Sequence, residues 1–342
     1  MRSTGKSRLA MLAIATTINC FAAESGMQAN GEVHEIVLPL ENAGPTTLAI
    51  APDGDVWFTL GTGNAIGRVE ADGSNFRHYP LPNENSSPRI IALGADGNMW
   101  FSEHTGNRMG RITPNGEIAE FDIPTPDSQP RAIALGSDGN IWFGEFTGNR
   151  IGRITPAGDI TEFEIPTADS GPRALSAGPD GNIWFSEFRS SRIGRITPAG
   201  EITEFDLPRP NAGPGDITAG ADGAMWFVEL SGTMDGLQPD GNRVGRITMD
   251  GQVTEYAMPP GGNSPINIAV GPDRNIWYTK DATLGRVTGD GTITEFPVAP
   301  GAARTVGLTA GSDRQPPDRL IDRLWFTDPL NNRIAWLEFD TE

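Results

Sequence analysis

The stretch DGNIWFGE, residues 138–145, recurs along the chain with small changes. It returns as DGDVWFTL, DGNMWFSE, DGNIWFSE, DGAMWFVE, DRNIWYTK and DRLWFTD. The copies are 42 to 51 residues apart, close to the repeat length that is typical of a β-propeller blade. Seven copies predict seven blades, with their tryptophans packed between neighbours: Trp57, Trp100, Trp142, Trp184, Trp226, Trp277 and Trp325.

One repeat unit contains four segments with strand character. These are RAIAL (131–135), IWFGE (141–145), NRIGRIT (149–155) and ITEFEIP (160–166). An Asp-Gly pair separates the first two, as a tight hairpin requires, and a proline ends the fourth. No sustained 3.6-residue apolar period supports helices instead. Each blade is therefore predicted to be a four-stranded antiparallel sheet in an all-β fold.

The two ends of the chain predict how the ring closes. HEIVLPL (34–40) matches a fourth strand but has no blade before it, whereas the last copy, ending in NNRIAWLEFD (331–340), lacks one. The N-terminal strand should complete the C-terminal blade, which removes open sheet edges. We expect a single propeller domain over residues 24–342.

The first 23 residues have the pattern of a secretory signal peptide. Arg2, Lys6 and Arg8 precede an apolar stretch too short to span a bilayer, and Ala22 and Ala23 offer a cleavage point. Cleavage would remove Cys20, the chain's one cysteine, so no disulfide or thiolate site is expected. We therefore expect an exported protein.

The charge balance narrows the range of partners. The chain has 26 basic and 44 acidic residues, and a formal charge of −18. Such a surface repels phosphate backbones, so nucleic acid is not an expected partner. No later segment is apolar enough to insert into a membrane, and we expect a monomer that meets a small-molecule or peptide ligand.

Three arginines directly follow a proline where the innermost strands begin: Arg89, Arg131 and Arg173. They should line one side of the mouth of the central channel, which we call its top. Thr46, Gly215, Ile266 and Val306 stand at the equivalent places of other blades, and the opposite side offers Asp216, Asn267 and Lys280. The second strands end nearby with glutamates, which we expect to pair with the arginines: Glu103, Glu145, Glu187 and Glu229.

These charges have two interpretations. The pairs could simply hold the channel mouth, where exposed ion pairs contribute roughly 0 to 1 kcal/mol each. Alternatively, the guanidinium groups could grip a carboxylate, a phosphate or an ester carbonyl in a polar pocket that also includes the glutamates.

Two insertions interrupt the repeat. Residues 234–242 should form a loop on the top face, and residues 314–323 a loop on the bottom face. The upper loop could be a lid over the channel or a tolerated surface excursion.

Whole repeat units carry a resemblance to a known family. SGPRALSAGPDGNIWFSEFRSSRIGRITPAGEITEFDLP (170–208) and SQPRAIALGSDGNIWFGEFTGNRIGRITPAGDITEFEIP (128–166) resemble blades of the streptogramin B lyases, also called virginiamycin B lyases. The resemblance implies a seven-bladed propeller that opens the ester-linked ring of a cyclic depsipeptide antibiotic by C–O elimination. It also implies a divalent metal, usually magnesium. From the residues themselves no cofactor is assigned, and the metal ligands are unknown.

The family's catalytic residues are not matched here. Its histidines follow the blade-opening proline, and one of those prolines is preceded by glutamate. None of the blade-opening prolines of this chain is followed by histidine or preceded by glutamate: Pro45, Pro88, Pro130, Pro172, Pro214 and Pro265. No catalytic residue is therefore carried over.

A relocated catalytic group remains an alternative. His34 and His78 fall on outermost strands and should face solvent, whereas His104 is placed at the top. His104 as base, Glu103 as orienter or metal ligand, and Arg89 as electrostatic stabiliser could support an elimination.

The preferred interpretation is recognition of a polar or anionic small molecule or peptide at the top of the channel. The alternatives are a metal-dependent C–O lyase of the streptogramin type, or a metal-dependent lactonase or hydrolase. A protein-interaction platform is a third class.

Overall fold

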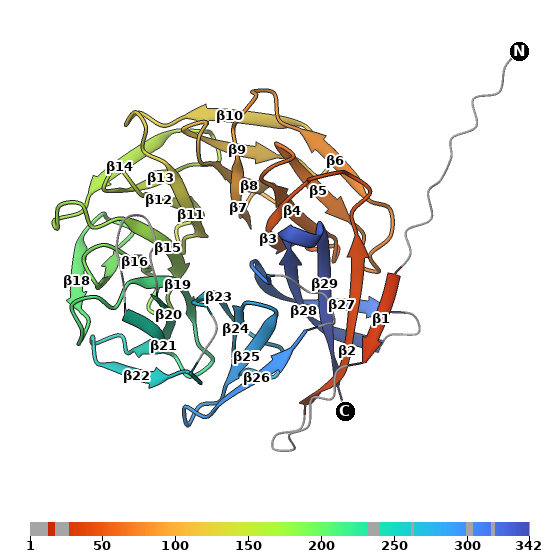
Figure 1. Ribbon diagram of the computed structural model, residues 1–342. Helices are drawn as coiled ribbons and strands as arrows, with labels where there is room; N and C mark the ends of the chain where they lie inside the picture. The colour runs from red at the N-terminus through yellow and green to blue at the C-terminus, as the bar shows by residue number, and fades with distance from the viewer. Residues whose placement is uncertain are drawn as a thin grey trace, which may run out of the picture.

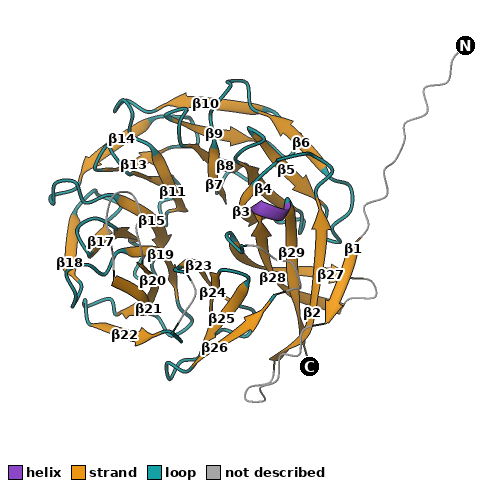
Figure 2. Ribbon diagram, in the orientation of Figure 1, coloured by secondary structure: helices purple, strands orange, loops and turns teal. Residues whose placement is uncertain are grey.

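The computed structural model describes residues 13–17, 27–231, 240–260, 263–298, 304–315 and 319–341. Its strands form seven antiparallel sheets arranged in a ring around a central channel (Figure 1). The predicted seven-bladed β-propeller is confirmed. Among the described residues the helical element is one 3-10 turn, η1 (Pro329–Asn331), which Figure 2 sets among strands and loops. None of the described helices could cross a membrane.

Each blade runs from an innermost to an outermost strand, and blades 1 to 4 follow the chain. Blade 1 contains β3 (Pro45–Ile50), β4 (Val56–Leu60), β5 (Ala65–Val69) and β6 (Arg77–Pro80). Blade 2 contains β7 (Pro88–Leu93), β8 (Met99–Glu103), β9 (Arg108–Ile112) and β10 (Ile118–Asp122). Blade 3 contains β11 (Pro130–Leu135), β12 (Ile141–Glu145), β13 (Arg150–Ile154) and β14 (Ile160–Glu164). Blade 4 contains β15 (Pro172–Ala177), β16 (Ile183–Glu187), β17 (Arg192–Ile196) and β18 (Ile202–Asp206).

The remaining blades complete the ring. Blade 5 contains β19 (Pro214–Ala219), β20 (Met225–Ser231), β21 (Asp240–Ile247) and β22 (Val253–Ala257). Blade 6 contains β23 (Pro265–Val270), β24 (Ile276–Lys280), β25 (Thr283–Val287) and β26 (Ile293–Pro297). Blade 7 contains β27 (Leu308–Gln315), β28 (Arg319–Asp328), β29 (Arg333–Thr341) and β2 (Met27–Val37).

Blade 7 closes the ring with strands from both ends of the chain. β2 pairs antiparallel with β29, so the N-terminal segment supplies the fourth strand, as expected. A short strand, β1 (Ala13–Thr17), pairs with the outer edge of β2. β1 lies within the segment expected to be a signal peptide, so a mature chain that starts at residue 24 would lack it. That cleavage stays a prediction.

The repeated DGNxW motif explains both the first hairpin and the position of the tryptophan. In blade 3 the Asp138 side chain accepts hydrogen bonds from the Asn140 backbone N–H, at 3.1 Å, and from Trp142 Nε1, also at 3.1 Å. Gly139 takes the left-handed backbone (φ 77°) that the turn needs. One aspartate therefore shapes the turn and fixes the indole.

The core lies between neighbouring blades. Trp142 of blade 3 packs in one buried cluster with Leu175 and Phe185 of blade 4, as the repeat predicts. Phe143 packs in the cluster on the other side of blade 3, with Trp100 of blade 2, and Gly152 on β13 makes room for its ring, since a Cβ atom there would lie 2.1 Å from it. Burial of seven such layers supplies the main stabilisation of a ring without disulfides.

The two insertions differ from the expected surface loops. In the lower insertion, β27 and β28 are longer than the corresponding strands of the other blades. Their pairing includes residues 314 and 315 of β27 and residues 319–323 of β28. In the upper one, residues 240–242 already belong to β21. The rest of the expected upper loop, up to residue 239, lies outside the described residues.

Candidate functional site

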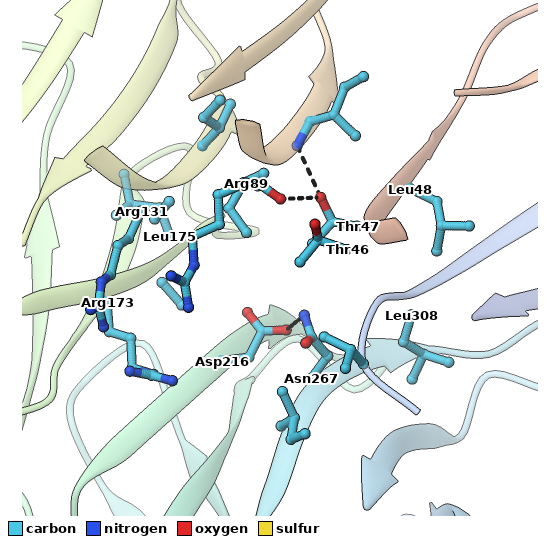
Figure 3. A pocket seen from close by; sticks show the side chains of 17 residues that line it. Thr46, Thr47, Leu48, Arg89, Arg131, Arg173, Leu175, Asp216, Asn267 and Leu308 are labelled. Atoms are coloured by element: carbon cyan, nitrogen blue, oxygen red, sulfur yellow. Dashed lines mark hydrogen bonds between the residues drawn. The ribbon is translucent and has the colours of Figure 1, made fainter. Parts of the chain in front are cut away.

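A cavity of about 200 Å³ opens at the top of the central channel, where the innermost strands begin. Arg89, Arg131 and Arg173 line one side of it, and Asp216 and Asn267 line another (Figure 3). The structure thus brings the three arginines into one cavity, as expected. Thr46, Ile266 and Val306 also line it from the equivalent places in other blades.

In blades 1 to 6 a β-bulge at the start of the innermost strand turns these side chains toward the channel. In blade 2, Pro88 pairs with Glu103 and Ile91 with Phe101, so Arg89 and Ile90 together oppose Ser102. Ser102 Oγ accepts a hydrogen bond from the bulged Ile90 N–H at 3.2 Å. Such a bulge bends the strand and re-aims a side chain.

In blade 1 the same kind of hydroxyl also links neighbouring blades. Thr59 Oγ1 accepts from the Thr47 N–H at 3.2 Å and donates to the carbonyl oxygen of Arg89, in blade 2, at 2.9 Å. The arginine backbone is therefore fixed by the preceding blade. The sequence contains a signal for this arrangement, because Ser or Thr often follows the repeated Trp-Phe pair.

Aromatic rings hold two of the guanidinium groups. Arg131 is 9% exposed, and its guanidinium carbon lies 3.7 Å from the centre of the Phe146 ring. In blade 4 the guanidinium of Arg173 lies 5.1 Å from the ring of Phe188. Arg189 adds a further cation 4.6 Å from Phe146 and forms an ion pair with Asp169. These cation–π contacts orient the positive side of the cavity.

Asp216 supplies the negative group of the cavity. One carboxylate oxygen accepts from Asn267 Nδ2 and from the Ile268 N–H, each at 3.0 Å, and the other accepts from the Ile217 N–H at 3.0 Å. Burial raises the pKa of Asp216 to about 6, although these donors and the charge of Arg173 oppose the shift. Sequence reasoning placed Asp216 opposite the arginines but did not select it as a site residue.

The four second-strand glutamates do not line the cavity. Glu145 is fully buried, and the charged groups that act on it are Glu162 of β14 and Arg150 of β13, rather than Arg131. Burial, reinforced by the charge of Glu162, raises the pKa of Glu145 to about 8. The expected ring of arginine–glutamate pairs around the channel is therefore wrong.

The other three glutamates follow the same pattern with local partners. Glu187 accepts from Ser190 Oγ at 2.8 Å and has its pKa raised by burial to about 8. Burial raises the pKa of Glu103 and of Glu229 to about 7. Glu229 lies 2.5 Å from Arg209, and Glu103 lies 3.9 Å from Arg108.

Lys280 takes the glutamate position in blade 6. It is 3% exposed, and its Nζ lies 3.1 Å from Glu295 Oε1, so it does not line the cavity as the sequence suggested. At the start of the next strand, Thr283 stands where blades 2 to 5 and blade 7 have arginine. In blade 6 the positive charge therefore lies on the second strand instead of the third. It still neutralises the carboxylate of the outermost strand, which is Glu295.

A model of the Virginiamycin B lyase family matches residues 31–241 and 168–342. The chain belongs to the virginiamycin B lyase family. A search of curated proteins found no match.

Solved lyase structures share the family fold over most of this chain. Selenomethionine-substituted virginiamycin B lyase from Staphylococcus aureus is 35% identical, with a TM-score of 0.81, over 91% of this chain and 99% of that one. A catalytically inactive His→Ala variant of the same lyase, with quinupristin, is 36% identical with the same coverage and TM-score. A streptogramin B lyase structure is 32% identical, with a TM-score of 0.80, over 90% of this chain and 97% of that one. A putative gluconolactonase at 17% identity and TM-score 0.51 shares the fold alone.

The histidines of this virginiamycin B lyase family member lie outside the cavity lining. His104 begins the turn after β8, where its N–H donates to the Ser87 carbonyl at 3.2 Å. That is the place of Phe146 in blade 3 and Phe188 in blade 4. Neighbouring Glu103 faces Glu120 and Arg108, so the expected trio of His104, Glu103 and Arg89 is not assembled around the channel.

The two remaining histidines lie on outer strands, as expected. His78 is exposed on β6. His34 is only half-buried rather than facing solvent, because its ring stacks on Trp336 at 5.0 Å and its Nε2 lies 3.8 Å from Glu338.

The magnesium ion that the lyase family implies does not fit this cavity. Among the described residues, no group of three or more His, Cys, Asp or Glu side chains is arranged to hold a metal. Asp216 is the carboxylate in the part of the lining that the structure describes. Its oxygens already accept three hydrogen bonds, and three guanidinium groups share the space. This donor set repels a dication and suits an anion.

Proposed function

We propose that this virginiamycin B lyase family member is an exported protein that binds an anionic small molecule or peptide end at the top of its channel. The observation that carries the proposal is the convergence of Arg89, Arg131 and Arg173 in one cavity. Each guanidinium presents a planar fork of donors that matches a carboxylate or a phosphate.

Preorganisation strengthens the argument for binding. Phe146 and Phe188 hold the guanidinium groups of Arg131 and Arg173, so little side-chain freedom is lost when an anion arrives. The described lining of the cavity carries three arginines and one aspartate, although the whole chain carries a formal charge of −18. An anion is therefore drawn to the mouth rather than to the outer surface.

Calorimetric titration of the purified protein with acetate, benzoate, inorganic phosphate and a short acidic peptide tests this proposal. Replacing Arg173 with Met should weaken binding of the preferred anion by about 10-fold or more, since charged hydrogen bonds contribute roughly 1.5–3 kcal/mol. Arg77→Met, on the exposed part of β6, is the matched control and should bind normally. Equal binding by wild type and Arg173→Met would reject the proposal.

Export is a separate part of the proposal. It rests on the basic start and short apolar stretch of residues 1–23. N-terminal sequencing of the protein recovered outside the cytoplasm should find Glu24 first. Recovery of the intact N-terminus in the cytoplasm alone would contradict export.

A lyase reaction is the second candidate, and Asp216 is the observation that favours it. Its carboxylate faces three guanidinium groups and has a pKa near 6, as a general base requires. Asp216 would take the proton from the carbon beside a carbonyl. The C–H electron pair would form a C=C bond as the adjacent C–O bond breaks, and the arginines would stabilise the departing carboxylate.

Mass spectrometry of quinupristin incubated with the protein tests this second candidate, because a relative was solved with that molecule. Ring opening leaves the mass unchanged, so chromatographic separation and fragmentation must identify the linear product. Asp216→Asn should abolish the reaction, whereas Asp250→Asn, on the exposed surface, should not. Absence of product with wild-type protein would reject the candidate.

A further inference from the structure

Each innermost strand carries one aliphatic side chain below the level of the arginines. These seven side chains, which we call the aliphatic ring, pack mainly in the clusters between blades, and five of them also line the cavity. In every blade, the innermost strand places Leu or Ile opposite the aromatic residue that follows the tryptophan of the second strand. The pairs are Leu48 with Phe58, Ile91 with Phe101, Ile133 with Phe143, Leu175 with Phe185, Ile217 with Phe227, Ile268 with Tyr278, and Leu308 with Phe326.

The ring forms the inner end of the cavity. In blades 1 to 6 the aliphatic residue comes two positions after the residue that follows the blade-opening proline, and in blade 7 Leu308 comes two positions after Val306. This spacing places each aliphatic residue roughly 6 Å further into the channel. Leu48, Ile91, Ile133, Leu175 and Leu308 line the cavity together with the three arginines. The cavity is thus charged near its mouth and apolar below.

We infer that the ligand is a small amphipathic carboxylic acid, with its carboxylate on the arginines and its apolar group on the aliphatic ring. This inference rests on the proposed anion-binding function and names its ligand class. An acid of this kind matches both zones of the cavity at once, whereas an inorganic anion leaves the aliphatic surface exposed to water.

Charge favours a monoanion at this site. Asp216 lines the same cavity and lies close enough to Arg173 for the two charges to interact. A dianion such as phosphate would meet stronger repulsion from Asp216 than a carboxylate does. The volume of about 200 Å³ also limits the ligand to a small molecule, since pockets that take drug-sized ligands have volumes of roughly 300–1,000 Å³.

A homologous series of straight-chain acids tests the ligand class. Calorimetry with acetate, butyrate, hexanoate and octanoate should give an affinity that rises about fourfold for each methylene buried, until the cavity is full. Hexanamide, which has the same chain without the charge, should bind at least 10-fold more weakly than hexanoate.

The outcomes separate this inference from the proposed function. Equal affinity for all four acids, lost in Arg173→Met, would overturn the amphipathic ligand and leave the anion site standing. Equal affinity of hexanamide and hexanoate would overturn the role of the carboxylate. Binding of no acid, or binding unaffected by Arg173→Met, would overturn both proposals.

A variant that enlarges the cavity tests where the alkyl chain of the bound acid lies. Leu175→Ala enlarges the apolar end, so the tightest-binding acid should become longer by one or two methylenes. Leu207→Ala also truncates a buried leucine but lies outside the cavity lining, and it should leave the order of affinities unchanged. An unchanged order in Leu175→Ala would contradict the placement of the chain on the aliphatic ring.

Discussion

Replacing Glu145 with Gln should stabilise the protein at alkaline pH and change little at acidic pH. The carboxyl group is fully buried beside Glu162, and neither of its oxygens has a hydrogen-bond partner among the described residues. Its pKa rises from 4.5 to about 8, so the folded state holds a proton that the unfolded chain releases.

The sign follows from proton linkage. The folded state binds more protons than the unfolded state between about pH 4.5 and pH 8, so the free energy of unfolding falls as pH rises through this window. The full contribution is present below the window and is lost above it. A shift of about 3.5 units at 1.36 kcal/mol per unit sets an upper limit of about 5 kcal/mol. Local rearrangement and water entry reduce it, and we expect about 1–3 kcal/mol.

Urea unfolding followed by tryptophan fluorescence measures this effect. Glu145→Gln should gain about 1–3 kcal/mol over wild type near pH 9 and less than about 0.5 kcal/mol near pH 5. Glu164→Gln is the matched control, because Glu164 is exposed on β14, the outermost strand of the same blade. A variant that is no more stable than wild type near pH 9 would refute the reasoning.

Three further predictions concern the channel. Asp216 ionises as pH rises through about 6, so anion affinity should fall across that pH, and titrations of Asp216→Asn should show no such fall. Phe146→Leu removes the ring under Arg131 and should weaken anion binding about 2- to 10-fold in the same titration, with the folded state intact by circular dichroism. Ser102→Ala leaves the bulged amide of blade 2 without its acceptor and should lower the free energy of unfolding by about 1–3 kcal/mol in urea; an unchanged midpoint would show that the hydroxyl does not hold the bulge.

Much of the fold could be predicted because the repeat carries its own structural chemistry. The Asp-Gly turns mark the hairpins, the tryptophans mark the interfaces between blades, and the unmatched strand at residues 34–40 predicts the closure of the ring. These features depend on local turn motifs and on the number of strands in each repeat. They can be predicted without knowing which way each side chain points.

The direction of the glutamates could not be predicted in the same way. Arg131 and Glu145 lie at neighbouring ends of paired strands, which suggested contact, but the bulge turns the arginine into the channel while Glu145 faces β13 and β14. One signal was present in the repeats. In blade 6, Lys280 stands at the position of the second-strand glutamate, and Thr283 stands at the position of the third-strand arginine. This paired exchange indicates that the second-strand and third-strand side chains interact with each other.

Asp216 was undervalued for a related reason. Its position after Gly215 is shifted by one residue from that of the arginines, so alignment of the repeats placed it opposite the arginines without marking it as a site residue. The bulge exposes two successive residues of the innermost strand to the channel, and Asp216 uses the second of them.

A crystal structure of the protein soaked with 4-bromobutyrate tests the central claim most directly, because the anomalous signal of bromine locates the chain of the acid. We predict a carboxylate within hydrogen-bonding distance of at least two of Arg89, Arg131 and Arg173, and bromine against the aliphatic ring. A bound acid whose carboxylate lies away from all three arginines would contradict the account.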